Sequence, residues 1–352
     1  MIPVIDNILG YFSSDLGVDL GTANTLIHVA GKGIVIREPS IVTIHKKTKK
    51  VIAIGTDARK MIGRTPINIT TVRPLKDGVI SDYDTTLAML SYFVKKVHER
   101  PGRSISIPRP RIVLGIPSGV SEVERRALFD VAYASGAREA YLVEEPMAAA
   151  IGAGLPVADA KGSMIVDIGG GTSDMAVISL SGIVSGKSLK IGGDAMDRDI
   201  INYVRFRYGL ALGEKTAEDV KMLLGSAYPM QVEKQMLVRG RDLEKGLPKQ
   251  VKLTSTQIRE ALAPTIRTIV EAVRDTLEDA PPELAADIAE KGIVLCGGGS
   301  LIYGLPKLIA QETKMPVSVA VDPMYCVVVG CANVLGNKEL LKKVNLKIND
   351  KK

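Results

Sequence analysis

Two segments of this 352-residue chain combine an aspartate with a turn of small residues that could bind phosphate. They are Asp19 with Gly21, Thr22 and Asn24, and Asp167 with Gly169, Gly170, Gly171 and Thr172. Glycine lets backbone N–H groups approach a phosphate chain closely, and a carboxylate can hold a magnesium ion through bound water. One Gly-Thr turn is weak support, because such turns close many hairpins. The two together, each after an apolar run, favour a site that grips a nucleoside triphosphate and Mg²⁺ from two sides.

A third cluster of small residues consists of Gly297, Gly298, Gly299 and Ser300. It follows the apolar run 293–295 and leads towards a predicted helix near Leu305. Its backbone could approach a nucleoside or its α-phosphate, although a plain loop would have the same composition. The sequence contains neither a P-loop motif nor a Rossmann Gly-x-Gly-x-x-Gly fingerprint after a first strand, which excludes both of those nucleotide-binding classes.

The segment Glu144-Glu145-Pro146 lies at a predicted strand-to-helix junction between the two turns. A carboxylate there could orient a water molecule for in-line attack on a γ-phosphate. It could also be a helix-start carboxylate that the helix dipole favours. No Ser/His/Asp or Cys/His arrangement stands out. The chain has three cysteines, at Cys296, Cys326 and Cys331. They are too few for a disulfide framework and fit no usual zinc spacing, which indicates a reduced compartment.

The elements that must position these residues alternate between strand and helix. Apolar, β-branched runs predict strands at 16–20, 25–29, 34–44, 112–116, 142–143, 164–168, 175–180, 182–189, 293–295 and 317–321. Helical spacing predicts helices at 84–97, from Ser121, from near Pro146, and at 194–208, 217–224, 255–277 and 326–335. Ser121 and Glu124 form a capping-box pattern. The polar segment 231–252 is assigned neither type of element.

The order of strands and helices starts again at about residue 164. Asp19 and Asp167, which are 148 residues apart, each end an apolar strand and precede a turn of glycine and threonine. This repetition indicates two related α/β halves that face each other, and the length also suits about two domains. An apolar fraction of 46% excludes a disordered chain.

Six segments in this order resemble the superfamily of actin, sugar kinases and heat-shock chaperones, and closely its bacterial actin-like MreB family. They are DLGVDLGTANTLIHVAGKGIVIREPSIVTI (15–44), LVEEPMAAAIG (142–152), IVDIGGGTSDMAVISL (165–180), IGGDAMD (191–197), KTAEDVKMLLGSAYP (215–229) and IVLCGGGSLIYGLP (293–306). The resemblance runs from about residue 15 to residue 336. It is therefore far more specific than any single glycine turn.

The resemblance implies an α/β, actin-like two-lobed fold. Two related mixed β-sheet domains of ribonuclease H-like type would carry flanking helices, each with a small subdomain, and the nucleotide would lie in the cleft. The expected boundaries are 1–45, 80–159 and 326–352 for subdomain IA, 46–79 for IB, 160–193 and 256–325 for IIA, and 194–255 for IIB.

The resemblance also implies a role for each motif residue. Asp19 to Asn24, which includes Ala23, would be the first phosphate loop, and Asp167 to Thr172 the second. Asp19 and Asp167 would hold Mg²⁺ through water. Glu145 would position the hydrolytic water, with help from Thr172. Gly297 to Ser300 would be the adenosine loop, and Glu218 and Lys221 would lie beside the adenine. The cleft on the second lobe would be lined by Gly192, Gly193 and Asp194.

The leading interpretation is a bacterial actin-like cytoskeletal protein that binds ATP or ADP, hydrolyses ATP slowly, and forms filaments of paired protofilaments in cell-shape determination. The alternatives are a small-molecule kinase and a chaperone-type ATPase on the same fold. A kinase would need an aspartate base and substrate-lobe insertions, and a chaperone would need a peptide-binding domain, for which 352 residues leave little room. Pelleting with and without ATP would discriminate between these functions.

Basic segments suggest contact with an anionic membrane. The net charge is +7, and the tail Lys338–Lys352 holds six lysines against Glu339 and Asp350, although a solvated tail would have the same composition. The loop Arg100–Arg111 adds four arginines, and MreB-family proteins carry a membrane-inserting loop at the matching place. A third candidate is the N-terminal segment, in which Ile5, Ile8, Leu9 and Phe12 share one helical face, although a helix packed on the body or a frayed terminus would have the same pattern.

No apolar run is long enough to span a bilayer. We therefore expect a cytoplasmic protein that lies peripherally on the inner face of the cell membrane, with membrane-bound shape or wall-synthesis proteins as further partners. Nucleic acid is not expected as a partner, because recognition motifs are absent and stacking aromatics are scarce.

Overall fold

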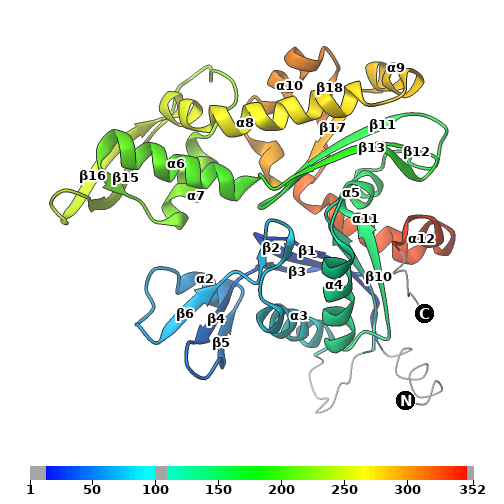
Figure 1. Ribbon diagram of the computed structural model, residues 1–352, viewed down its shortest axis with the longest axis horizontal. Helices are drawn as coiled ribbons and strands as arrows, with labels where there is room; N and C mark the ends of the chain where they lie inside the picture. Colours follow the sequence, from blue (N-terminus) through cyan, green and yellow to red (C-terminus); the bar gives the residue numbers. More distant parts are fainter. Residues whose placement is uncertain (1–12, 100–108, 347–352) are drawn as a thin grey trace. The chain divides into compact units, whose positions relative to one another are not determined.

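The computed structural model describes residues 13–99 and 109–346, which divide into two compact units (Figure 1). Unit 1 comprises Met1–Lys161, Ile178–Val184 and Met324–Lys352, and unit 2 comprises Gly162–Val177 and Ser185–Pro323. Two separate clusters of buried apolar side chains form the cores of the fold. The finer division into four subdomains stays a prediction.

A five-stranded sheet forms the centre of unit 1, in the order β10-β9-β1-β2-β3. The strands are β1 (Leu16–Leu20), β2 (Asn24–Val29), β3 (Gly33–Pro39), β9 (Arg111–Ile116) and β10 (Glu139–Glu144). β1 pairs antiparallel with β2 and parallel with β9, so it occupies the middle of the sheet. Its apolar side chains are buried, as expected of a central strand that is covered on both faces.

The described helices of unit 1 include α3 (Tyr83–His98), α4 (Glu122–Ala134), α5 (Glu145–Gly152), α11 (Cys326–Gly336) and α12 (Lys338–Val344). The predicted capping box is confirmed, because the Glu124 backbone N–H donates to Ser121 Oγ and the Ser121 N–H donates to the Glu124 carboxylate. α5 and α11 pack at two glycines. A Cβ on Gly152 would lie 1.8 Å from the Cys326 carbonyl oxygen, and one on Gly330 would lie 1.8 Å from the Ala148 carbonyl oxygen.

A smaller sheet in the order β5-β4-β6 extends unit 1. Its elements are β4 (Val42–His45), β5 (Val51–Ile54), α2 (Thr56–Lys60) and β6 (Ile69–Val72), followed by the pair β7 (Leu75–Lys76) and β8 (Val79–Ile80). The single strand predicted over 34–44 is wrong, because the chain leaves β3 at Pro39 and enters the small sheet at Val42. Ser40 lies at this break, where its hydroxyl donates to the Gly21 carbonyl at 2.6 Å.

The five-stranded sheet of the second half has the order β13-β12-β11-β17-β18. Its strands are β11 (Ser163–Ile168), β12 (Ser173–Ser179), β13 (Gly182–Leu189), β17 (Ile293–Cys296) and β18 (Val317–Val319). β11, β17 and β18 are parallel, so their carboxyl ends meet at one edge of the sheet. The associated helices are α8 (Ser255–Glu278), α9 (Pro282–Lys291) and α10 (Leu305–Thr313), with short 3₁₀ turns η1 (Gly298–Leu301) and η2 (Pro323–Tyr325).

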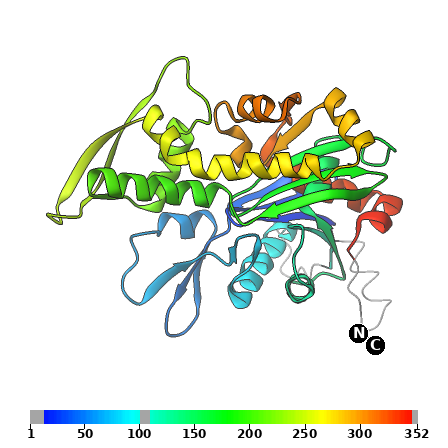
Figure 2. The ribbon, with the colours of Figure 1, turned by 45° about the horizontal axis from the view of Figure 1, so that its top comes forward.

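The rest of unit 2 consists of α6 (Gly193–Tyr208), α7 (Glu214–Leu224) and a sheet of β14 (Leu210–Ala211), β15 (Gln235–Asp242) and β16 (Pro248–Thr254). The polar segment left unassigned therefore holds a β-hairpin, which Figure 2 shows projecting at one end of unit 2. Asp242 holds its turn, because the carboxylate accepts from the Glu244 and Lys245 N–H groups and pairs with Lys249. The hydrogen bond from Lys245, with these other contacts, lowers the pKa of Asp242 to about 2.

Within residues 13–99 and 109–346, no helix combines the length and the apolar composition needed to cross a membrane.

Candidate functional site

The first glycine turn closes the β1–β2 hairpin of unit 1. Gly21 is required there, because a Cβ at this position would lie 2.8 Å from the Asn24 carbonyl oxygen and 3.3 Å from the Asp19 carboxylate. The Ser40 hydroxyl, which also lies 2.9 Å from the Thr25 hydroxyl, fixes the turn from the end of β3. The Asp19 carboxylate thus lies beside a turn whose backbone is held in place before any ligand arrives.

Asp19 and Glu145 lie in one buried region of unit 1, around the Cys331 thiol. Burial raises the pKa of Asp19 to about 7. Burial, followed by the charges of Asp19 and Glu145, raises the pKa of Cys331 well above its usual value. Glu145 is the first residue of α5 and is buried, and a Cβ on Gly115 would lie 3.3 Å from its Cγ. The structure therefore brings together two carboxylates that come from separate segments of the sequence.

Thr22 connects the first turn to another hairpin of unit 1. Its buried hydroxyl oxygen accepts a hydrogen bond of 3.0 Å from the Gly78 N–H, in the turn between β7 and β8. Asp77 and Gly78 both have positive φ, which is typical of a tight two-residue hairpin turn. The β7–β8 turn is thus attached to a side chain of the predicted first phosphate loop.

The second glycine turn follows β11 in unit 2 and packs against the beginning of α6. The Gly169 N–H donates to the Thr172 carbonyl at 2.8 Å, which closes the turn. The N–H groups of Gly193 and Asp194 donate to the carbonyls of Gly169 and Gly170, at 3.0 and 2.8 Å. A Cβ on Gly192 would lie 2.7 Å from the Gly169 oxygen, so glycine is needed for this contact.

The third cluster packs directly on Asp167. β11 and β17 pair in parallel with Asp167 opposite Cys296, so the two strands end together. Gly297 has a φ of +75°, and a Cβ there would lie 2.3 Å from both the Asp167 carboxylate and the Ile168 carbonyl oxygen. The Ser300 hydroxyl donates to the Gly297 carbonyl at 2.7 Å. The second and third clusters, 130 residues apart in the chain, therefore form one continuous group in unit 2.

Lys221 of α7 contacts this group, together with Asp197, which the sequence analysis missed. The Lys221 ammonium lies 2.9 Å from the Gly193 carbonyl oxygen and 2.9 Å from the Asp197 carboxylate. Burial raises the pKa of Asp197 to about 6, Lys221 opposes this rise, and the charges of Glu218 and Asp194 add to it. The sequence could have indicated Asp197, because it lies one helical turn after Gly193 in the segment IGGDAMD (191–197) that carries the family resemblance.

The predicted magnesium ligands Asp19 and Asp167 belong to different units, and each lies beside a glycine turn. The described residues contain no cluster of three or more His, Cys, Asp or Glu side chains that could hold a metal ion. Mg²⁺ bound to a nucleotide usually takes one or two carboxylates and completes its shell with phosphate oxygens and water. The donor set on each unit fits that chemistry.

The predicted membrane segments are only partly described. Residues 1–12, 100–108 and 347–352, which include the N-terminal apolar face, most of the Arg100–Arg111 loop and the end of the tail, lie outside the described residues. Of the loop, Arg111 pairs with Asp15 at 2.7 Å. The start of the tail forms α12, in which Leu341 and Val344 are buried. The Leu346 N–H donates to the Leu142 carbonyl at 2.9 Å, so the tail begins as a packed part of unit 1.

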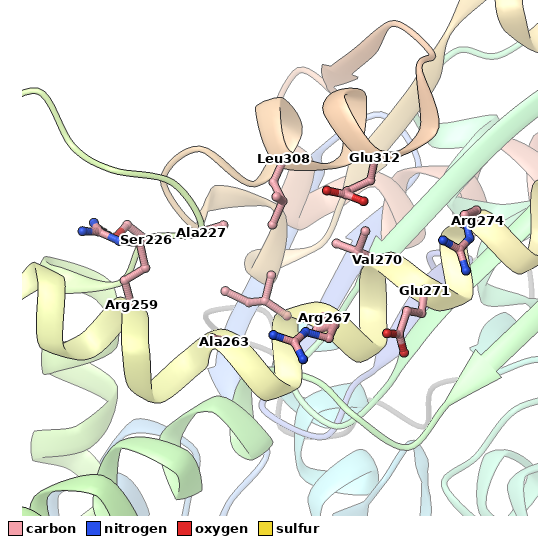
Figure 3. Close-up of a pocket in the computed structure, with 11 residues that line it drawn as sticks. Ser226, Ala227, Arg259, Ala263, Arg267, Val270, Glu271, Arg274, Leu308 and Glu312 are labelled. Atoms are coloured by element: carbon pink, nitrogen blue, oxygen red, sulfur yellow. Dashed lines mark hydrogen bonds between the residues drawn. The ribbon is translucent and has the colours of Figure 1, made fainter.

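A cavity of about 350 Å³ lies between α8 and α10 in unit 2 (Figure 3). Its apolar lining includes Ile266, Val270 and Leu308, and charged side chains such as Arg267 and Glu312 border it. None of the residues predicted to bind nucleotide lines this cavity.

Comparison with known proteins gives a match to the family model described as MreB/Mbl protein, over residues 13–343. The cell shape-determining protein MreB of Escherichia coli K12 is 53% identical over 330 residues, which cover 93% of this chain and 94% of that protein. The cell shape-determining protein Mbl of Bacillus subtilis 168 is 46% identical over 335 residues, with coverage of 95% and 99%.

Among solved structures, MreB5 of Spiroplasma citri bound to ADP superposes with a TM-score of 0.87 at 39% identity, over 94% of this chain and 98% of that chain. A second structure of that protein is bound to AMPPNP. The MamK double helical filament matches with a TM-score of 0.78 at 23% identity, over 92% and 99% of the two chains, and this likeness concerns the fold alone. The predicted actin-like fold is confirmed, and the chain belongs to the MreB/Mbl family.

Proposed function

We propose that this bacterial actin-like protein acts in cell shape by binding ATP with Mg²⁺, hydrolysing it slowly, and assembling into filaments on the inner membrane surface. The observation that carries the nucleotide proposal is the packing of Gly297 against Asp167. This contact joins the second phosphate turn and the third glycine cluster into one surface of glycine backbone and carboxylate. The ADP and AMPPNP bound to the Spiroplasma relative support the same ligand class.

Each group of residues has a role in this proposal. The backbone of Gly21, Thr22, Ala23 and Asn24 would bind phosphate on unit 1, and that of Gly169, Gly170 and Gly171 on unit 2. Glu218 and Lys221 would border the adenine, and Gly193 would line the nucleotide site on unit 2. The adenosine loop would be Gly297, Gly298, Gly299 and Ser300. Asp19 and Asp167 would hold Mg²⁺ through water, and the ion would neutralise charge on the phosphate oxygens. Glu145 would orient the attacking water, and Thr172 would assist.

Burial of Asp19 and Glu145 suits these roles. A carboxyl whose pKa is raised to about 7 by burial is costly to ionise alone, and a bound cation would favour its charged form. A glutamate at the start of a helix is held with its carboxylate near a fixed backbone, so it can position water without a large rearrangement.

The replacement Glu145→Ala tests the hydrolytic assignment. We expect the variant to bind ADP as the unaltered chain does but to release phosphate about 100-fold more slowly, because a positioned acid–base group typically contributes that much. Isothermal titration with ADP and a phosphate-release assay with ATP provide the two readouts. Glu144→Ala removes the neighbouring, half-buried carboxylate and should leave both unchanged. Phosphate release from Glu145→Ala at the normal rate would refute the role of Glu145.

Self-assembly is supported by opposite charge at the two ends of unit 2. The exposed face of the β15–β16 hairpin carries Arg239, Arg241 and Lys252. The other end, around α9, carries exposed Asp279, Glu283 and Glu290. α8 connects the two ends, and its 24 residues span about 36 Å. A contact between unlike ends repeats from one copy to the next, and it produces an open filament when the rotation between copies does not close a ring.

Membrane association through the basic tail and the Arg100–Arg111 loop stays part of the proposal. In the described part of the tail, Lys342 and Lys343 are exposed whereas Leu341 and Val344 are buried. This segment would therefore contribute charge to an anionic surface, and its buried apolar side chains would stay in the fold.

A further inference from the structure

The small sheet of unit 1 carries a concentration of positive charge that the sequence analysis did not consider. Residues 46–79 hold nine Lys and Arg against two Asp, a net charge of +7 that equals the net charge of the whole chain. Four of these lysines fall within five residues, in the turn between β4 and β5: Lys46, Lys47, Lys49 and Lys50. Every other part of the chain taken together is therefore electrically neutral.

These four lysines are presented to solvent without neutralising partners. All are exposed, and among the described residues none forms an ion pair. The carboxylates nearest to the turn in the sequence are paired with other lysines: Asp57 pairs with Lys60 at 2.9 Å, and Glu38 pairs with Lys96 at 3.0 Å. We refer to Lys46, Lys47, Lys49 and Lys50 as the lysine turn.

The fold holds the lysine turn in a defined shape at the outer end of the small sheet (Figure 1). The Lys49 N–H donates to the His45 carbonyl at 2.8 Å, and the Thr48 N–H donates to His45 Nδ1 at 3.3 Å. The Lys46 N–H donates to the Asn68 carbonyl at 2.9 Å, which places the segment before β6 alongside the turn. That segment contains Ile67, an apolar side chain that is 90% exposed.

We propose that the lysine turn, with Ile67 beside it, binds an anionic phospholipid surface. Lysines near an anionic leaflet are attracted to its negative surface potential, and an exposed branched apolar side chain can enter the headgroup boundary. This inference rests on the membrane association proposed above and assigns it to a surface outside the tail and the Arg100–Arg111 loop.

The composition of the segment disfavours a nucleic-acid ligand. Residues 46–79 contain no Phe, Tyr or Trp on which a base could stack, and the turn presents lysines where bidentate readout of a base edge would use arginine. An exposed isoleucine also has no role against a phosphate backbone, whereas it suits a lipid surface.

The experiment measures co-flotation of the full chain with vesicles of phosphatidylglycerol and phosphatidylcholine at low salt. The variant K46Q/K47Q/K49Q/K50Q removes four positive charges from the turn. The matched control, K161Q/K215Q/K291Q/K314Q, removes four charges from exposed lysines elsewhere. Circular dichroism verifies that both variants fold. A third variant, Ile67→Ser, tests the apolar contact.

We expect the turn variant to bind anionic vesicles at least about tenfold more weakly than the unaltered chain, and the control to lose far less. Ile67→Ser should weaken the binding that persists in 0.5 M salt, where charge attraction is screened. Equal losses in the turn variant and the control would overturn the proposal, since they would show only an effect of net charge. Unchanged binding of the turn variant would overturn it as well.

Two further outcomes separate this inference from the function on which it rests. If the unaltered chain fails to bind anionic vesicles, the proposed membrane association fails, and this inference fails with it. If the turn variant loses affinity for a single-stranded oligonucleotide but keeps its affinity for vesicles, the turn binds nucleic acid and the lipid assignment is wrong.

Discussion

Asp197 and Lys221 form an ion pair beside the residues that we assign to nucleotide binding in unit 2, and both side chains are only 15% exposed. Burial makes ionisation of the carboxyl costly, and Lys221 offsets only part of that cost, so the pKa of Asp197 is raised from 3.8 to about 6. The folded chain therefore retains a proton on this carboxyl over a range of pH in which the unfolded chain has released it. A measurable pH dependence of stability follows from this one residue.

The replacement Asp197→Asn should abolish that dependence. Stability falls with rising pH wherever the folded state binds more protons than the unfolded state. The free energy of unfolding of the unaltered chain, relative to the variant, should thus decrease by up to about 3 kcal/mol from pH 4 to pH 6.5 and stay level above that. Urea titrations across this range provide the measurement, with Asp279→Asn at an exposed position as control. Parallel profiles for the unaltered chain and Asp197→Asn would contradict the assignment.

At the scale of elements, the packing of α5 on α11 determines where Glu145 lies. The two helices approach so closely that their backbones touch at Gly152 and Gly330. α11 also contacts the central strand, since a Cβ on Gly17 would lie 2.6 Å from the Ala332 nitrogen. The helix that begins with Glu145 is therefore positioned by a segment about 180 residues later in the chain.

A methyl group at this crossing should force the two helices apart. We expect Gly330→Ala to lower the free energy of unfolding by about 2 kcal/mol or more, because overpacking at a backbone contact outweighs the usual helical preference for alanine. Gly336→Ala, at the end of the same helix, has open space around the added carbon and should be neutral or slightly stabilising. Denaturant unfolding of both variants makes the comparison, and equal stability of the two would show that the crossing tolerates a side chain.

At the scale of the whole molecule, opposite charge at the ends of unit 2 predicts how assembly responds to charge reversal. Arg239→Glu with Arg241→Glu should reduce pelleting with ATP several-fold, and Glu283→Lys with Glu290→Lys should do the same, because like charges would then meet. A chain that carries all four changes restores opposite charges at the contact and should pellet again. If it stays in the supernatant, or if either pair of changes has no effect, these two ends do not meet in the filament.

Much of this molecule could be predicted from the sequence because its central strands and glycine turns have strong local patterns. The strand 182–189 and the helix from residue 255 match the structure closely. The β15–β16 hairpin escaped prediction because Leu237 lies on the exposed face of β15 whereas Gly240 and Asp242 lie on its less exposed face, which conceals the alternation of polar and apolar residues. Asp242 holds the turn by accepting from the Glu244 and Lys245 N–H groups, a local aspartate pattern that the sequence analysis did not use. The contacts of Gly297 with Asp167 and of Lys221 with Asp197 are long-range. Motif order can suggest that such residues are near one another, whereas only the fold shows which atoms meet.

The place of α11 has a consequence for biosynthesis. The first part of unit 1 is synthesised before unit 2, but α11, which covers the central strand of unit 1 and supports Glu145, is synthesised after unit 2. Most of unit 2 is synthesised without interruption in between, so it can complete its core while the first part of unit 1 is still waiting for its last helix. A nascent chain would therefore place Glu145 in its final position only after α11 has been synthesised and has packed on α5. Hydrolysis, which we propose depends on Glu145, would begin only after that step.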